Sequence, residues 1–215
     1  MIDMTPIEIH NELLAGRIIK HLERRNFSAY YCATSTEAIA LVKSLIPAGS
    51  SVTWGGSQTI REMGLTSELI DSGDYKVIDR DKAVTPEEKR RCYLDAMDVD
   101  YFLTSANAIT QDGVIVNIDG RGNRVAAITW GPENVIHIIG LNKVAPTIEA
   151  ALARARNVAA TINTARLGCD TPCRLDGVCH NCNSPQCICN YVHFTRNSFP
   201  AHRHTVILVG ENWGY

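Results

Sequence analysis

Apolar and polar residues follow two periods along this chain, and the periods predict helices and strands in alternation. Residues 5–26 carry apolar side chains at helical spacing. Thr5 and Glu8 suit a capping box ahead of that run, and Pro6 suits the first helical position. We therefore expect a long amphipathic helix over this segment, with an apolar stripe made by Ile9, Leu13, Leu14, Ile18 and Leu22.

The rest of the chain also shows helical and strand patterns in alternation. Short runs rich in β-branched and aromatic residues predict strands, and runs that begin with a capping residue predict the helices between them. The predicted strands are 27–32, 50–54, 75–79, 99–107, 134–144 and 205–209, and the predicted helices are 34–46, 57–63, 66–72, 85–97 and a run ending at 165. Such alternation favours an α/β fold with a Rossmann-like, mostly parallel sheet covered by helices on both faces.

Two segments interrupt this pattern. Residues 113–130 suggest a β-hairpin whose polar turn runs from Asp119 to Asn123. Residues 167–195 have no period and few large apolar side chains, so they cannot build a core of their own. Because the apolar run 205–209 follows, we expect one domain over 1–215, with 167–195 as a cysteine-rich, metal-binding excursion from it.

Composition narrows the choice of partners and compartment. The net charge is −2 and no run of like charges occurs, so nucleic acid is not expected as a partner. The first residues lack a positively charged export signal, and no apolar run approaches the roughly 20 residues that cross a bilayer. We expect a cytoplasmic protein without a membrane partner.

Cysteine placement is the strongest chemical signal. Of eight cysteines, six lie in the 21 residues from Cys169 to Cys189, and in a reducing cytosol such crowding favours thiolate ligation over disulfides. Cys179 and Cys182 form a Cys-x2-Cys pair, a spacing that places two sulfurs on one metal centre. With no second such pair, an iron–sulfur cluster suits the segment better than a structural zinc, and cysteines without metal are a third reading. The isolated Cys32 and Cys92 are expected to be packing residues.

A glycine turn is the first candidate ligand site. Gly55, Gly56 and Ser57 join a buried strand to a helix, followed by Thr59, and glycines let backbone approach a bound phosphate or carboxylate. An ordinary tight turn uses the same residues, so the motif alone leaves both readings open. Glu62, one turn into the helix, would face the same cleft.

A second candidate follows the strand 99–107. Asn107 and Asp112 lie at its carboxyl end, with Asn117, Asn123 and Arg124 beyond them. Ligands of open α/β sheets bind at the carboxyl ends of strands, so this stretch and the glycine turn are expected to line one crevice. Asp112–Gly113 also suits a simple turn. No histidine or lysine stands out as a catalytic group in these crevice segments.

Taken together, these motifs resemble the LUD-domain family of lactate utilisation proteins, in particular its short bacterial members with a cysteine-bearing C-terminus. The matching stretches are WGGSQTIREMGL, SANAITQDGVIVNIDGRGNRVAAITWGP, VIHIIGLNKV, TPCRLDGVCHNCNSPQCICN and VILVGENWGY. The resemblance implies the fold of ribose-5-phosphate isomerase, glucosamine-6-phosphate deaminase and coenzyme A transferases. It also implies Cys173, Cys179, Cys182 and Cys189 as ligands of a [4Fe-4S] cluster, with Cys169 and Cys187 as extra thiols.

Three functions stay open at this level. The resemblance implies conversion of lactate or a related small hydroxy or keto acid, as an oxidoreductase component with redox partner proteins or as a cluster-dependent lyase or hydrolase. In the second, a non-redox isomerase or acyl-transfer enzyme holds a structural zinc, and Asp112, Asn117 and Glu62 transfer protons. The third is a regulatory module that binds a ligand without turnover. All three expect a small anionic organic ligand, bound by Gly55, Gly56, Ser57, Thr59, Asn107, Asn123 and Arg124, and leave a homo-oligomer open.

Overall fold

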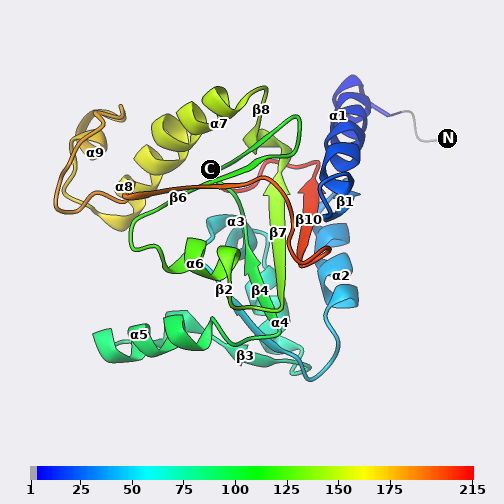
Figure 1. The fold of residues 1–215 in the computed structure, drawn as a ribbon, viewed down its shortest axis with the longest axis horizontal. Coiled ribbons are helices and arrows are strands. Elements are labelled where there is room, and N and C mark those ends of the chain that lie inside the picture. Colours follow the sequence, from blue (N-terminus) through cyan, green and yellow to red (C-terminus); the bar gives the residue numbers. More distant parts are fainter. Residues whose placement is uncertain (1–3) are drawn as a thin grey trace.

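The computed structural model describes residues 4–215, and its centre is a six-stranded sheet whose neighbouring strands are all parallel (Figure 1). The strand order is β1-β10-β7-β4-β2-β3. The predicted Rossmann-like, mostly parallel sheet is therefore confirmed. The strands are β1 (Ser28–Cys32), β2 (Ser51–Trp54), β3 (Lys76–Ile78), β4 (Tyr101–Thr104), β7 (Asn134–Gly140) and β10 (His204–Val209).

Helices cover both faces of this sheet. Alternate residues of one strand point to opposite faces, so Ile207 joins the core beneath α2, α3 and α4 while Leu208 joins the core beneath α1. Ala96 and Met97, directly after α5, and helix α6 cover the remaining part of the α1 face, around Phe102 and Val135. The bounds are α1 (Pro6–Glu23), α2 (Ser35–Leu45), α3 (Gln58–Glu62), α4 (Leu65–Asp71), α5 (Pro86–Asp95) and α6 (Asn123–Thr129).

Capping residues begin the helices where the sequence predicts. Thr5 and Glu8 form both hydrogen bonds of the capping box of α1, and Thr85 and Glu88 do the same for α5. Of the predicted apolar stripe of α1, Ile18 and Leu22 enter the core together with Ala15, whereas Ile9 and Leu13, nearer the start of the helix, are exposed. None of the helices within residues 4–215 combines the length and the apolar character that crossing a bilayer requires.

A second sheet lies beside the first, in the order β8-β5-β6-β9, and it corrects the predicted hairpin. Residues 114–130 do not form two strands, because a strand, β6, is followed by helix α6. The hairpin is formed instead by β5 and β6, which pair antiparallel across a turn at Asp112–Gly113 where Gly113 has φ +84°. The strands are β5 (Ala108–Thr110), β6 (Ile115–Asp119), β8 (Val144–Ala145) and β9 (Tyr191–Thr195).

Three consecutive helical stretches lead into the cysteine segment, and the first two pack on the second sheet. They are α7 (Ile148–Arg154), the π-helical η3 (Ala155–Ala160) and α8 (Thr161–Leu167). Short 3-10 turns η1 (Arg80–Lys82) and η2 (Leu141–Lys143) follow β3 and β7. A π-helical turn widens a helix locally and is frequent near functional sites. Here it places Ala159 and Ala160 in the wall of the cavity described below.

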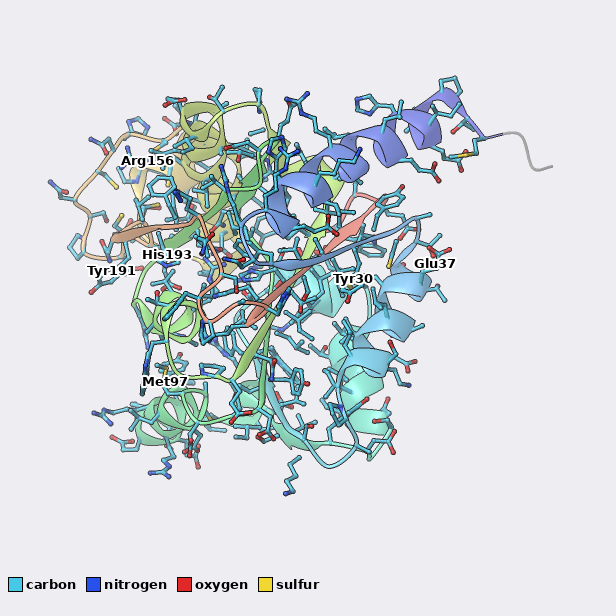
Figure 2. All side chains as sticks on the ribbon, turned by 45° about the vertical axis from the view of Figure 1, so that its right-hand side comes forward. Tyr30, Glu37, Met97, Arg156, Tyr191 and His193 are labelled. Carbon is cyan, nitrogen blue, oxygen red and sulfur yellow. The ribbon has the colours of Figure 1, made fainter. Side chains whose placement is uncertain are left out.

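The cysteine-rich segment is irregular apart from α9 (Pro172–Asp176), at the end of the molecule opposite α1 (Figure 1). Its C-terminal part differs from expectation, since Tyr191–Thr195 form β9 and pair antiparallel with β6. Figure 2 shows Tyr191 and His193 of this strand on the opposite side of the molecule from Tyr30 and Glu37. The irregular excursion thus ends at Asn190, and the chain re-enters a sheet immediately afterwards.

The buried side chain of Arg203 links the start of β10 to α6. Arg203 is 9% exposed and donates hydrogen bonds to the carbonyl oxygens of Ala127, Ile128 and Pro132 at 3.1, 2.7 and 2.9 Å. These carbonyls lie at or just beyond the C-terminal part of α6, where helical acceptors lack partners of their own. Arg203 therefore fixes α6 to the start of β10.

Candidate functional site

A cavity of about 810 Å³ opens at the carboxyl ends of β2 and β4. The turn after β2 supplies Gly56, Ser57 and Thr59, and the loop after β4 supplies Ser105 and Asn107. The two segments that the sequence expects to share a crevice therefore line one cavity. Asn123 and Arg124, at the start of α6, complete this part of the wall.

The cavity wall is strongly cationic, although the chain as a whole has a net charge of −2. Within the described part of the chain, Asp119 is the one acidic side chain among the lining residues. Arg80, Lys89, Arg121, Arg124, Lys143 and Arg166 all line it. Because low-dielectric walls concentrate the field of such groups, the cavity is suited to an anion.

Arg124 is the best-anchored cation. Its guanidinium donates to the Oδ1 atoms of Asn117 and Asn107 at 2.9 and 3.0 Å, to the Ile118 carbonyl at 2.6 Å and to Asp119 at 3.3 Å. Burial lowers the pKa of Arg124, and Asp119 opposes that shift. With a further contact to the Ser105 carbonyl at 3.4 Å, these bonds use all five N–H groups of Arg124, so the guanidinium is a rigidly held positive charge in the wall.

Gly55 owes its place to this arginine. A Cβ atom at position 55 would lie 3.1 Å from Cδ and 3.3 Å from Cγ of Arg124. Gly55 is not a lining residue itself, so it acts by leaving room for the guanidinium. Gly56 does line the cavity, and the nearest atom to a Cβ there is Arg80 Nη1 at 3.8 Å.

Lys143 is a cavity group that sequence reasoning missed. It ends the 3-10 turn η2 after β7, is 2% exposed, and donates from Nζ to Thr59 Oγ1 at 2.7 Å and to Ser105 Oγ at 3.2 Å. Burial, then Arg154 and Arg124, lower its pKa to about 7, and Glu62 opposes them. The signal was present in the sequence, because Lys143 follows an apolar strand whose carboxyl end lies at this edge.

The predicted proton-transfer residues lie outside the cavity wall. Asp112 is half-exposed in the β5–β6 turn, bound to Thr110 and, at 2.8 Å, to Arg25. The Thr110 hydroxyl and then Arg25 keep the pKa of Asp112 below its usual value. Glu62 accepts a hydrogen bond from the Gly214 amide at 3.1 Å, and Asn117 is fully buried against Arg124. The structure does not bring these three side chains together, and their catalytic roles stay predictions.

The cysteine segment forms one side of the cavity. Cys169 and Cys187, the two extra thiols, are lining residues. The chain at Ile188 passes so close to Gly120 that a Cβ there would meet the Ile188 Cα at 3.1 Å, and Asn190 donates to the Gly120 carbonyl at 3.0 Å. The segment is thereby fastened to the end of β6, beside Asp119.

The four predicted ligands lie in the same half-buried segment. Burial, with the nearby sulfurs of Cys187, Cys179 and Cys173, raises the pKa of Cys189 to about 12. The Cys173 sulfur lies 3.3 Å from the Thr171 hydroxyl and 3.5 Å from that of Thr164. Within residues 4–215, no three Cys, His, Asp or Glu side chains stand in positions that would hold one metal ion. The donor set suits a soft metal, while its ligand geometry is not formed here.

Comparison with known proteins agrees with the architecture. The LUD domain family model matches residues 15–209. A DUF162 family protein from Deinococcus radiodurans has a similar structure, with a TM-score of 0.54 and 12% identity over 93% of this chain and 97% of that one.

Two weaker likenesses are to translation initiation factors. They are eIF2B beta from Chaetomium thermophilum (TM-score 0.39, 13% identity, 54% of this chain and 44% of that one) and eIF-2B from Pyrococcus horikoshii OT3 (0.35, 20%, 54% and 48%). No curated protein matches the sequence. At 12% identity the structure from Deinococcus radiodurans establishes the fold, not an activity.

Proposed function

Because the chain belongs to the LUD-domain family, we propose that it binds an iron–sulfur cluster and converts a small hydroxy or oxo acid in the adjoining cavity. One observation carries the proposal: the cysteine-rich segment and a strongly cationic wall enclose the same cavity. Thiolate ligation of a cluster requires a reducing compartment, and we propose the cytoplasm.

The cavity chemistry supports an organic acid as ligand. Arg166 lines the cavity and donates from Nε and Nη2 to Asn163, which leaves Nη1 for a ligand, while the N–H groups of Arg124 are used by its neighbours. A carboxylate takes paired hydrogen bonds from such groups. Ser105, Asn107 and Asn123 add neutral polar groups for a hydroxyl or carbonyl oxygen. A ligand with one carboxylate and one neighbouring oxygen uses both kinds of group.

Cys173, Cys179, Cys182 and Cys189 are the residues that would hold the cluster. Their thiols share a half-buried segment, and three of them are near enough for mutual electrostatic influence. A bound [4Fe-4S] cluster would supply electron transfer or a Lewis-acidic iron. The protein's own residues would bind and orient the acid, with Arg166 on its carboxylate.

Metal analysis tests this proposal. The protein is purified without oxygen, and iron, zinc and acid-labile sulfide are measured together with the absorption spectrum. We expect about four irons and four sulfides per chain, the content of a cubane cluster. Cys182→Ser should remove them, whereas Cys92→Ser, which changes a half-buried cysteine on α5, should not. Iron retained in Cys182→Ser, or lost equally from both variants, would refute the ligand assignment.

One observation favours a second function. Lys143 gives the cavity a buried amine that can transfer a proton without help from a metal. A non-redox isomerase, whose zinc would be only structural, needs such a group. About one zinc per chain in colourless protein would select that function over the first.

A further inference from the structure

We infer that Lys143 is a nucleophile that forms an imine with the carbonyl carbon of a 2-oxo acid bound in the cavity. The inference rests on the proposed function in one respect, since it takes the bound ligand to be a small oxo acid. It goes further by giving the cavity a covalent step that needs no metal.

Placement is the first support. Lys143 is the one buried lysine among the residues that the structure describes, and it lines the cavity. Thr59 and Ser105 fix the position of Nζ through hydroxyl oxygens. Within residues 4–215, no carboxylate lies within ion-pair distance of Nζ. An amine without a carboxylate partner is free to lose its proton and attack.

Charge is the second support. Two cations, Arg124 and Arg154, lower the pKa of Lys143, and Glu62 is the one acid that opposes this shift. Arg154 itself donates to the Asn107 and Asn142 carbonyls. A lysine desolvated beside other cations is the arrangement that activates amines for attack on carbonyls. The basic side chains of the same wall can hold the carboxylate of the oxo acid while Nζ faces its carbonyl.

The step balances without another reactant. Neutral Nζ bonds to the carbonyl carbon, and a proton moves from nitrogen to the former carbonyl oxygen to give a carbinolamine. The carbon–oxygen bond then breaks, the oxygen leaves as water with the second nitrogen proton, and a carbon–nitrogen double bond remains. The hydroxyls of Thr59 and Ser105 contact Nζ and can pass these protons.

Reductive trapping tests the inference. The protein, with its iron and sulfide content already measured, is incubated at pH 7 with pyruvate and sodium cyanoborohydride, which reduces an imine to a stable amine. We expect one attached pyruvate per chain, mapped to Lys143 by peptide mass spectrometry. Surface lysines, whose ordinary pKa is about 10.4, stay protonated and unlabelled.

Two variants control the experiment. Lys143→Arg keeps the positive charge, lacks the nucleophile, and should lose the label while keeping the circular dichroism spectrum. Lys20→Arg, on the exposed side of α1, should keep the label. Wild-type protein without label, or label spread over surface lysines or retained in Lys143→Arg, would overturn the inference. A labelled protein without iron would instead count against the cluster and leave the imine standing.

Discussion

Replacement of Lys143 by methionine should change how stability depends on pH. The pKa of Lys143 is lowered from 10.5 to about 7 in the folded protein, first by burial and then by Arg154 and Arg124, with Glu62 opposing. Between these pH values the unfolded chain binds a proton that the folded protein has released, so the free energy of unfolding rises with pH. The slope is about 1.4 kcal/mol per pH unit, which gives about 3 kcal/mol between pH 6 and 9.

The assay is urea unfolding of both proteins across that pH range, followed by tryptophan fluorescence. Trp54 is 2% exposed beneath the sheet and becomes solvated on unfolding. Other titrating groups are shared by the two proteins, so the difference in unfolding free energy isolates Lys143. We expect Lys143→Met to be the more stable protein at pH 6, and its advantage to shrink by about 3 kcal/mol by pH 9. Parallel pH profiles would refute a lowered pKa.

Two further substitutions test the packing around the cavity. Gly55→Ala should weaken pyruvate binding about tenfold by calorimetry, because its Cβ displaces Arg124, which holds Asn107 in the cavity wall. Gly56→Ala should change the affinity for pyruvate by about twofold at most. Equal effects of the two substitutions would contradict the role given to Gly55. Arg203→Met should lower the unfolding free energy by about 4 kcal/mol in urea, since three carbonyls lose a charged donor, and a loss below about 1 kcal/mol would contradict its role in holding α6.

Local rules predicted the parallel sheet and the helix starts, since capping and strand patterns depend on near neighbours. Residues 114–130 escaped these rules. An apolar run such as 125–128 fits both a strand pattern and a helix pattern. The helix is favoured by Arg203, far along the chain, which binds the carbonyls at the end of α6. β9 escaped as well, because its pairing with β6 depends on tertiary contacts.

The cavity was predictable in its location more than in its chemistry. Strand ends identified the edge where Ser57 and Asn107 meet. Composition gave no indication of the charge of the cavity wall. The net charge of −2 is a sum over the whole chain, whereas six basic side chains gather in this wall. Lys143 was missed for a related reason: whether a lysine is buried depends on what packs around it, and only the fold supplies Thr59 and Ser105.

The position of β10 in the sheet affects how the chain can be made. Ser28 in β1 pairs with Thr205, and β10 separates β1 from β7. A chain emerging from the ribosome must therefore hold α1 and β1 without their partner until the residues of β10 have been synthesised. Closing so long a loop is slow, and meanwhile β7 presents an unpaired apolar edge. We expect nascent chains that stop before residue 204 to aggregate or to bind chaperones.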